Sequence, residues 1–536
     1  MQQKRRIPRP VLPMLVLAGL VLPAPAAAAA TWGPVQTLSA AGAQAMEAQV
    51  AFDDQGNALA IWHRAGFVQT RFRPSGGGFG PVQTLSLPGG NALRGQVAFD
   101  ASGNALTVWG RSGAAPDFVQ ARPRSAAGSL GALQTVATGD AITDPRVAVD
   151  PAGNALVAWS RALNPGDDLR VETRFRPAGG AFQAIQTHSS PGVNASREQV
   201  AIDPAGNALV VWQRPTFGDN RVQARFRPAG GGFGVTQNLS VANAHAEGPQ
   251  VTFDPAGNAL ATWSLEFVVQ ERFRPAGGNF GLTRDISAAA ENSGAPQIAV
   301  DQAGNAVFVW STFGATERVQ ARFRSAAGGL GPIQNISAEG GNPDEQQVAF
   351  DPAGNAVAVW VRDDAAGSHR VQAAFRPAGG SFEPAQTLSA GGQDAAAPQV
   401  AMDTAGNALA VWHRQDGSFD RIEARFMPGP QTGGPSNDFR FGKLKRNRKR
   451  GTAKQTVIVP GPGELDLAKT KKVKRASKRA AAAGKVKLRI KPTRKSKRKL
   501  NRKGKAKVNA NVTYTPDGGD PNTKSKRLKL KRRQRR

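Results

Sequence analysis

The string DPAGNALVVW at Asp203–Trp212 decides the fold, because the chain holds eight copies of it with small changes. Each copy ends in a tryptophan, and neighbouring tryptophans are 47 to 53 residues apart. A period of this length accommodates one four-stranded sheet, and such repeats are typical of β-propellers. The eight residues are Trp62, Trp109, Trp159, Trp212, Trp263, Trp310, Trp360 and Trp412.

The fourth copy shows how one period divides into strands. An alternating segment at 199–202 leads through the turn at 203–207 into a strongly apolar segment at 208–212. A third segment at 222–227 alternates apolar and polar side chains, and a fourth follows near 235–240. Since all the connections are short, the four segments are predicted to form an antiparallel meander.

The turn after the first strand has a chemical explanation. Aspartate can accept hydrogen bonds from the backbone that follows it, and the Gly-Asn pair tolerates positive φ. One aspartate with Gly-Asn lacks the several oxygen ligands that calcium needs, so the turn is predicted to be structural and not a metal site. The predicted turn aspartates are Asp53, Asp100, Asp150, Asp203, Asp254, Asp301, Asp351 and Asp403.

The two ends of the repeat region complement each other. The eighth copy stops after its third strand, near Met427, while Trp32–Ser39 reads as a spare fourth strand before the first copy. Joining that strand to the last sheet would close a ring and remove exposed sheet edges. The sequence therefore predicts an all-β fold, an eight-bladed β-propeller closed by an N-terminal strand. An open solenoid is the alternative.

The repeat unit, written VAxDPAGNAxxxW with a following RVQARF, resembles secreted bacterial β-propeller repeats with NHL-like or Asp-box-like blades. The resemblance covers about residues 31–428 and implies architecture. Asp-box propellers include sialidases, whose tyrosine nucleophile has no counterpart here, because the only tyrosine, Tyr514, lies in the C-terminal part. No catalytic residue is carried over from the resemblance.

Charge and composition divide the chain into parts. Residues 1–30 combine a basic start, an apolar run and small residues, and they are predicted to be a cleaved signal peptide. The propeller region 31–428 and a linker at 429–439 follow. Residues 31–436 hold 29 arginines, no lysine and 34 acidic residues, a formal charge of −5. From residue 437 onward there are 37 basic and 5 acidic residues, a charge of +32, so a basic C-terminal domain is expected at 440–536.

The basic domain contains alternating segments that predict a small β-sandwich, with the stretch 469–479 mobile; partial disorder is the alternative. It resembles lysine-rich C-terminal modules of secreted actinobacterial proteins, a resemblance that implies no activity. So much charge predicts a polyanionic partner: an anionic cell-wall polymer, a lipid headgroup or an extracellular polyanion. The candidate contacts are Lys443, Lys445, Arg446, Arg448, Lys449, Arg450, Lys495, Lys497, Arg498 and Lys499.

Variable loops suggest where the propeller would bind a ligand. In a meander, the second connection and the crossover to the next sheet share one face, and these connections vary between copies. Binding residues often lie in such loops, although neutral drift would produce the same variation. Acids in these loops would prefer cationic or polyhydroxyl ligands, with a carbohydrate or protein as the partner. They are Asp167, Asp168, Asp219, Asp363, Asp364, Asp416 and Asp420.

Other candidates are interpreted as structural. The eight tryptophans are expected to pack between sheets and not to stack on sugars. Arginine pairs such as Arg71/Arg73 and Arg225/Arg227 are expected to cover sheet edges and to pair with nearby acids, and not to bind anions. His63 and His413 follow the tryptophans of the first and last copies, and two adjacent solvent-facing histidines are favoured over a metal or acid–base pair.

These observations favour a secreted, non-catalytic binding or scaffold protein, held at the cell surface by its basic tail. No cysteine exists, which excludes disulfides and thiolate chemistry, and no cofactor fingerprint or catalytic set stands out. No metal or cofactor is predicted, and a monomer is expected. The alternative is an extracellular polysaccharide-acting enzyme, a glycosidase or lyase, with its site in the propeller funnel. A pair of buried carboxylates in that funnel would favour a glycosidase.

Overall fold

A computed structural model describes residues 31–113, 116–142, 144–164, 166–216, 219–429, 437–517 and 521–533. The predicted signal peptide at 1–30 lies outside these residues. The chain separates into two compact units, which divide between Pro430 and Gln431. In the described part of the chain, no helix has the length and apolar character needed to cross a membrane.

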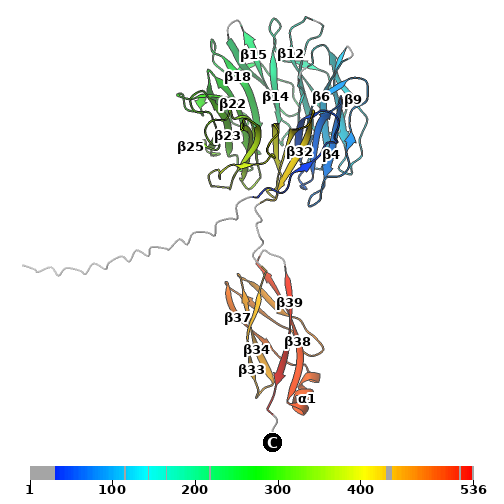
Figure 1. Cartoon of the computed structure of the whole chain (residues 1–536), viewed down its shortest axis with the longest axis vertical. Helices are drawn as coiled ribbons and strands as arrows, with labels where there is room; N and C mark the ends of the chain where they lie inside the picture. The colour runs from blue at the N-terminus through cyan, green and yellow to red at the C-terminus, as the bar shows by residue number, and fades with distance from the viewer. Residues whose placement is uncertain are drawn as a thin grey trace, which may run out of the picture. The chain divides into compact units, whose positions relative to one another are not determined.

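The first unit is all-β and propeller-like. Its described residues form eight four-stranded antiparallel sheets, and in seven of them the strands follow chain order, here named first to fourth. The first strand β14 lies in the middle of the unit, and the fourth strands β9 and β25 lie at its periphery (Figure 1). The sheets comprise β2 (Ala45–Phe52), β3 (Ala58–Arg64), β4 (Phe67–Arg73) and β5 (Gln83–Thr84); β6 (Asn91–Phe99), β7 (Ala105–Ser112), β8 (Asp117–Arg124) and β9 (Gln134–Gly139); β10 (Arg146–Val149), β11 (Ala155–Arg161), β12 (Arg170–Arg176) and β13 (Gln186–Thr187); β14 (Ser196–Ile202), β15 (Ala208–Thr216), β16 (Asp219–Arg227) and β17 (Gln237–Asn238); β18 (Ala246–Phe253), β19 (Ala259–Leu265), β20 (Val268–Arg274) and β21 (Thr283–Asp285); β22 (Asn292–Val300), β23 (Ala306–Phe313), β24 (Arg318–Arg324) and β25 (Leu330–Asn335); β26 (Asp344–Phe350), β27 (Ala356–Asp363), β28 (His369–Arg376) and β29 (Gln386–Thr387); and β30 (Ala395–Met402), β31 (Ala408–Asp416), β32 (Phe419–Met427) and β1 (Gln36–Thr37).

The second strand of each sheet is the apolar one, and it is buried on both faces. In β15, every described residue from Ala208 to Gln213 is buried, because neighbouring sheets cover both sides. Apolar clusters therefore form between consecutive sheets, each built around a tryptophan of the second strand. Such burial of large aromatic residues is a major source of stability.

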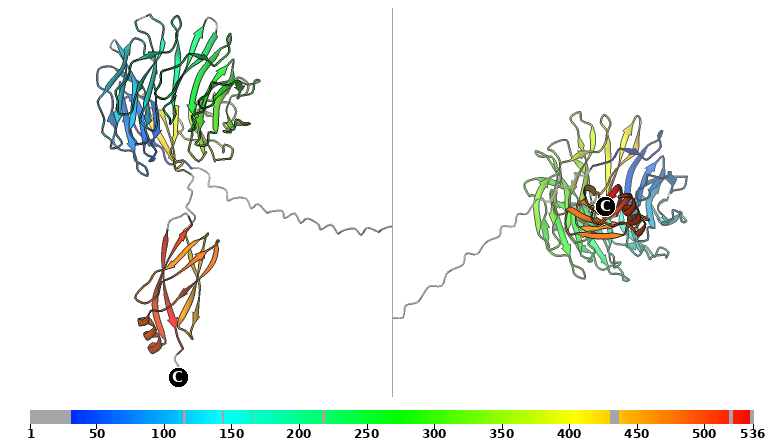
Figure 2. Two further views of the ribbon diagram at one scale, coloured as in Figure 1. Left: turned by 180° about the vertical axis from the view of Figure 1, so that it is seen from behind. Right: turned by 90° about the horizontal axis from the view of Figure 1, so that it is seen from below.

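The last sheet contains the N-terminal strand. Residues Gln36 and Thr37 of β1 pair with Ala424 and Glu423 of β32, so the sheet order is β1-β32-β31-β30. One apolar cluster joins residues of this sheet to residues of the first sheet, including Trp62. In the view from below in Figure 2, the last sheet, coloured yellow, follows next to the first sheet, coloured blue.

The described residues of the second unit, 437–517 and 521–533, form two sheets and one helix. The strand orders are β33-β34-β37 and β36-β35-β38-β39, and one apolar core that includes Leu488 and Tyr514 contains residues of both sheets. Phe439, which the sequence boundary left in the linker, is buried in this core. The elements are β33 (Arg440–Asn447), β34 (Thr452–Val459), β35 (Gly463–Leu467), β36 (Ala476–Ala480), β37 (Gly484–Ile490), α1 (Arg494–Lys503), β38 (Lys505–Pro516) and β39 (Asn522–Lys531).

Two features of this unit differ from the sequence prediction. The stretch 469–479 was expected to be mobile, but most of strand β36 lies in it. This segment is ordered because β36 pairs with β35 along its whole length. The helix α1 was not predicted, since it has a single large apolar residue, Leu500, which is buried in the core. The helix ends at Gly504, whose φ of +62° is the left-handed conformation that glycine adopts readily.

Candidate binding sites

The repeated turn between the first and second strands is a closed hydrogen-bonded unit. The Asp203 carboxylate accepts bonds from the backbone nitrogen of Asn207 at 2.8 Å and from its side-chain amide at 2.7 Å. The side-chain oxygen of Asn207 accepts a bond from the backbone nitrogen of Ala229, at 2.9 Å, in the turn between the third and fourth strands. The same two carboxylate bonds occur for Asp53, Asp100, Asp150, Asp254, Asp301, Asp351 and Asp403.

In most sheets, an arginine at the end of the third strand stacks on a phenylalanine of the preceding sheet. The Arg227 guanidinium carbon lies 3.8 Å from the ring centroid of Phe175 in the preceding sheet. Burial lowers the pKa of Arg227, and the aromatic face stabilises its charge in place of water. These arginines therefore lie between sheets, and the expected pairing with acids is wrong for most of them: among the six, an ion pair with a described residue is present only for Arg324, with Glu271. The other pairs are Arg73–Phe426, Arg124–Phe72, Arg274–Phe226, Arg324–Phe273 and Arg376–Phe323.

The seven loop acids lie in or beside the connections between second and third strands. The Asp168 carboxylate accepts a bond from the backbone nitrogen of Gly192 at 2.9 Å, which ties this connection to the following crossover. Hydrogen bonds from Arg370 and from the backbone hold the pKa of Asp364 below its usual value. The remaining carboxylates are engaged as follows: Asp167 by Asn164, Asp219 by Asn243, Asp363 by Asn342 and His369, Asp416 by Arg421, and Asp420 by Gln44.

The eight repeat tryptophans, and the two histidines that follow the first and last of them, contact other residues of the first unit. All eight repeat tryptophans are 0% exposed, which leaves no ring face for a sugar. His63 accepts a hydrogen bond from the backbone of Gly66, and burial lowers its pKa. His413 lies 3.9 Å from Asp420. Among the described residues, no group of three or more His, Asp or Glu side chains could hold a metal ion.

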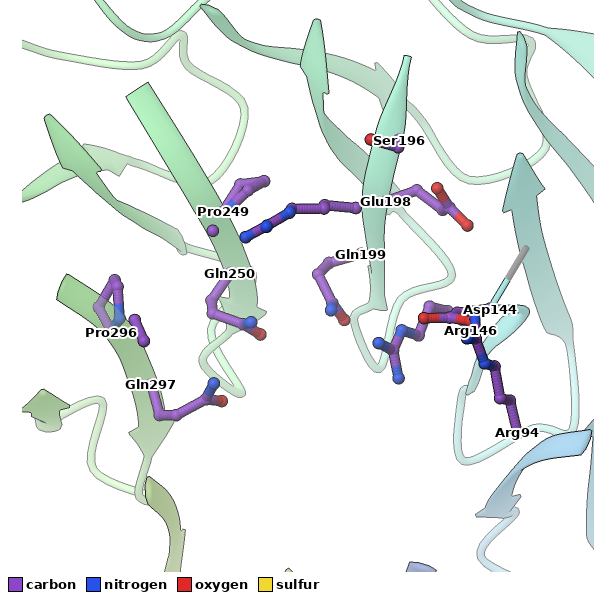
Figure 3. Close-up of a pocket in the computed structure, with 13 residues that line it drawn as sticks. Arg94, Asp144, Arg146, Ser196, Glu198, Gln199, Pro249, Gln250, Pro296 and Gln297 are labelled. Atoms are coloured by element: carbon purple, nitrogen blue, oxygen red, sulfur yellow. The ribbon is translucent and has the colours of Figure 1, made fainter. Parts of the chain in front are cut away.

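A pocket of about 400 Å³, here called the inner pocket, is lined by residues in or just before the first strands of five consecutive sheets. Arg146, Gln199, Gln250 and Gln297 occupy equivalent positions in four copies, four residues before the turn aspartate. Their side chains extend into the shared space (Figure 3). In the remaining copies this position holds Gln49, Gln96, Gln347 and Gln399, so Arg146 is the exception among eight.

The arginines of the inner pocket differ in their partners. Arg94 forms an ion pair with Asp144, and Arg197 lies 3.9 Å from Glu247. For Arg146, no side-chain hydrogen bond or ion pair exists with the described residues, and its Nε atom is buried. Burial lowers the pKa of Arg146; attraction by Glu198 opposes this shift, and repulsion by Arg94 adds to it.

Glu198 belongs to a contact between sheets. Its side chain accepts a hydrogen bond from the Ser160 hydroxyl of the preceding sheet, and the residue is 2% exposed. Burial raises the pKa of Glu198, an effect that the bond from Ser160 opposes. Gln346 holds the equivalent position three copies later and accepts a bond from Ser311 at 2.8 Å. The neutral amide of Gln346 accepts this bond as the Glu198 carboxylate does, so the contact does not need a negative charge.

A larger groove of about 970 Å³, here called the cationic groove, lies on the second unit. Lys445, Lys454 and Arg489 are direct cross-strand neighbours on β33, β34 and β37, and all three are exposed. None of the 14 described residues lining the groove is acidic. The other cations in it are Lys443, Arg446, Arg448, Arg450, Lys487 and Lys491.

The cationic groove gathers only part of the set expected from the sequence. Five of its cations come from the segment 443–450, as expected, but Lys449 does not line it. Lys495, Lys497, Arg498 and Lys499 lie on α1 and do not line the groove either. Sequence reasoning missed Lys454, Lys487, Arg489 and Lys491. The alternation of basic and apolar residues at 485–491 was the signal that could have identified three of these four.

Comparisons with known proteins give likeness at the level of the fold. No protein-family model and no curated protein matches the chain. A lectin, BP39L from Burkholderia pseudomallei, is 9% identical, with 65% of this chain and 100% of the lectin covered, at a TM-score of 0.48. The polysaccharide lyase Uly1 is 10% identical over 65% of this chain and 91% of the lyase, with a TM-score of 0.43. A puromycin hydrolase mutant is 12% identical over 80% of this chain and 62% of its own, with a TM-score of 0.44. Similarities this low carry no argument about the ligand or the activity of this chain. Proposals about either must be argued from the sites described above.

Proposed function

We propose that the protein is an exported, non-catalytic binding protein in two parts. The second unit attaches it to anionic polymers of the cell envelope through the cationic groove. The first unit is a recognition module, an eight-bladed propeller with NHL-like or Asp-box-like blades, closed by β1. The observation that carries the proposal is the row of three cations across one sheet, lining a groove without an acid among its described residues.

The row of cations supports a binding role because it is unfavourable for folding. Like charges directly opposite each other on neighbouring strands destabilise a sheet, by up to about 1 kcal/mol a pair. Lys454 faces Lys445 on one side and Arg489 on the other. A bound polyanion would remove this repulsion and release its own counterions, which favours binding at low salt.

Closure of the propeller is supported by contacts between the last and first sheets that repeat those between consecutive sheets. Arg73 stacks on Phe426 at 3.7 Å, as Arg227 stacks on Phe175. A Cβ atom added at Gly56 would lie 3.0 Å from the Asp403 carboxylate, the same relation that Gly257 has to Asp203.

The carboxylates of the inner pocket favour binding over hydrolysis. Glycoside hydrolysis needs two carboxyl groups that can reach the scissile bond. The two acids that line the inner pocket are Asp144, which is ion-paired with Arg94, and Glu198, which is buried against Ser160. Both carboxylates are thus already engaged by other side chains of the first unit.

The test measures binding of the purified protein to long-chain polyphosphate at several salt concentrations. The triple variant Lys445→Gln, Lys454→Gln, Arg489→Gln should bind about a hundredfold more weakly, because each cation near an anionic surface contributes about 1 kcal/mol. The matched control is Lys469→Gln, Lys474→Gln, Lys478→Gln, which removes the same charge outside the groove and should change affinity only a few-fold.

Two outcomes would contradict the proposal. Equal losses in both triple variants would mean that binding depends on overall charge and not on the groove. Retention of the protein on isolated envelopes without any dependence on salt would point to a specific receptor instead. Parallel measurements with double-stranded DNA and with vesicles of anionic lipid distinguish the possible sources of the polyanion.

A further inference from the structure

The departure of Arg146 from the repeat is the starting point. In a repeat protein, a residue kept in every copy meets a structural need that all copies share. Seven copies place glutamine four residues before the turn aspartate, so a neutral amide satisfies the backbone and the packing there. An arginine in the third copy is therefore not required by the fold of the sheet.

Among the described residues, no side chain forms a hydrogen bond or ion pair with the Arg146 guanidinium. Arg94 and Arg197, the other two arginines of the inner pocket, have acidic partners on neighbouring elements. Glu198 attracts Arg146 from a distance, but its carboxylate is bonded to Ser160. A guanidinium whose Nε is buried without a hydrogen bond is costly, and a ligand that supplies an acceptor would remove this cost.

We propose that the inner pocket binds the carboxylate of an acidic sugar, a hexuronate unit, with Arg146 pairing the carboxylate and the glutamines bonding the hydroxyls. The planar guanidinium matches a carboxylate with two parallel hydrogen bonds. Each glutamine amide both donates and accepts, which suits a hydroxyl group. The volume of about 400 Å³ lies within the range of small-molecule sites.

This inference rests on the proposed recognition role of the first unit and names its ligand class. It also replaces one part of the expectation that the propeller prefers cationic or polyhydroxyl ligands over anions: a hexuronate is polyhydroxyl, but it is an anion. That expectation depended on the loop acids, and the structure engages those acids in bonds within and between the loops. The charge in the inner pocket that has no partner among the described residues is positive, on Arg146.

The experiment is calorimetric titration of the full chain with sodium galacturonate and sodium glucuronate. Galactose and glucose are the matched uncharged sugars. The wild-type protein should bind at least one uronate ten- to a hundredfold more tightly than its neutral match, the range expected for a charge-assisted pair. Arg146→Gln should abolish this preference, and it should fold normally because glutamine is the residue of the other seven copies.

Two controls separate this proposal from the binding of polyanions. Arg176→Gln removes the same charge at a position outside the inner pocket, and it should keep the preference for uronate. The triple variant Lys445→Gln, Lys454→Gln, Arg489→Gln should lose polyphosphate binding and keep uronate binding. The proposal is overturned if neither uronate binds at millimolar concentration, or if a folded Arg146→Gln protein still prefers the uronate over the neutral sugar.

Discussion

Replacing His188 by leucine should make the first unit more resistant to acid. His188 is 3% exposed and packs against Phe233 and Trp212, with ring centroids 4.5 Å and 6.2 Å away. Its Nε2 atom lies 2.7 Å from the Thr173 hydroxyl, and its Nδ1 atom is buried with no hydrogen-bond partner in the described part of the chain. The other seven copies place an aliphatic residue here: Leu38, Leu85, Val136, Leu239, Ile286, Ile336 and Leu388.

The size of the effect follows from the pKa of His188. Burial, together with repulsion from Arg225, lowers this pKa from 6.5 to about 3. Above pH 6.5 the imidazole is neutral in both the folded and unfolded states and contributes nothing. Below pH 6.5 the imidazole of His188 is protonated in the unfolded chain but stays neutral in the folded chain. The free energy of unfolding therefore falls by about 1.4 kcal/mol for each pH unit until the pH reaches the folded pKa.

The assay is urea unfolding at pH 7.5 and at pH 4.5, followed by tryptophan fluorescence. All nine tryptophans precede residue 413, so this signal reports on the first unit alone. As the pH falls from 7.5 to 4.5, the free energy of unfolding of the variant should rise relative to that of wild type by about 3 kcal/mol. This value corresponds to the two pH units between 6.5 and 4.5, over which only wild type loses stability through His188. Carboxylates that titrate in the same range affect both proteins equally and cancel in the difference.

A second variant tests whether the buried Thr173 hydroxyl, which loses its partner when His188 is replaced, changes the result. His188→Leu combined with Thr173→Ala removes the hydroxyl that would otherwise be left buried, and five other copies hold alanine at the Thr173 position. It should show the same dependence on pH. If the difference between wild type and either variant stays constant within about 0.5 kcal/mol from pH 7.5 to 4.5, His188 is protonated in the folded state and the reasoning is wrong.

Three further predictions concern the fold. Deleting residues 32–39 should expose the edge of β32, lower the Tm and promote association, and an unchanged Tm with a monomeric elution volume would count against closure. Asn207→Ala removes the bond to Ala229 and should cost about 1–3 kcal/mol in urea unfolding, whereas a loss below about 0.5 kcal/mol would show that water replaces the bond. Lys454→Gln should raise the Tm of the second unit at low salt but not at high salt, and a lower Tm at low salt would contradict the repulsion between strands.

The spacing of the repeat made most of the first unit predictable. Period-2 alternation and turn chemistry are local properties, so the strands around Asp203 and Trp212 could be read from one copy alone. The pairing of Trp32–Ser39 with the last sheet was inferred from a missing strand, and β1 does pair with β32. The second unit was predictable where basic and apolar residues alternate, as in β37 and β38.

The inner pocket could not be predicted from one copy, because its side chains come from five different sheets. Within a copy, Arg146 is an ordinary polar residue on a strand. Alignment of the copies against each other would have shown it as the one exception among seven glutamines. The helix α1 was missed for another reason: seven of its ten residues are basic, and a single buried Leu500 gives no apolar periodicity.

Three departures from the repeat lie in the second and third copies. Pro123 replaces the phenylalanine on which the next sheet's arginine, here Arg176, would stack. His188 replaces an aliphatic residue, and Arg146 replaces a glutamine that faces the inner pocket. The turns of these copies keep the same Asp-Asn bonds as all the others, so the scaffold needs no such changes. These three changes lie on the second and third sheets, both of which contribute residues to the inner pocket. Under the proposed recognition role, ligand contacts are therefore expected in these two copies, while the uniform turns of all eight copies supply a rigid scaffold.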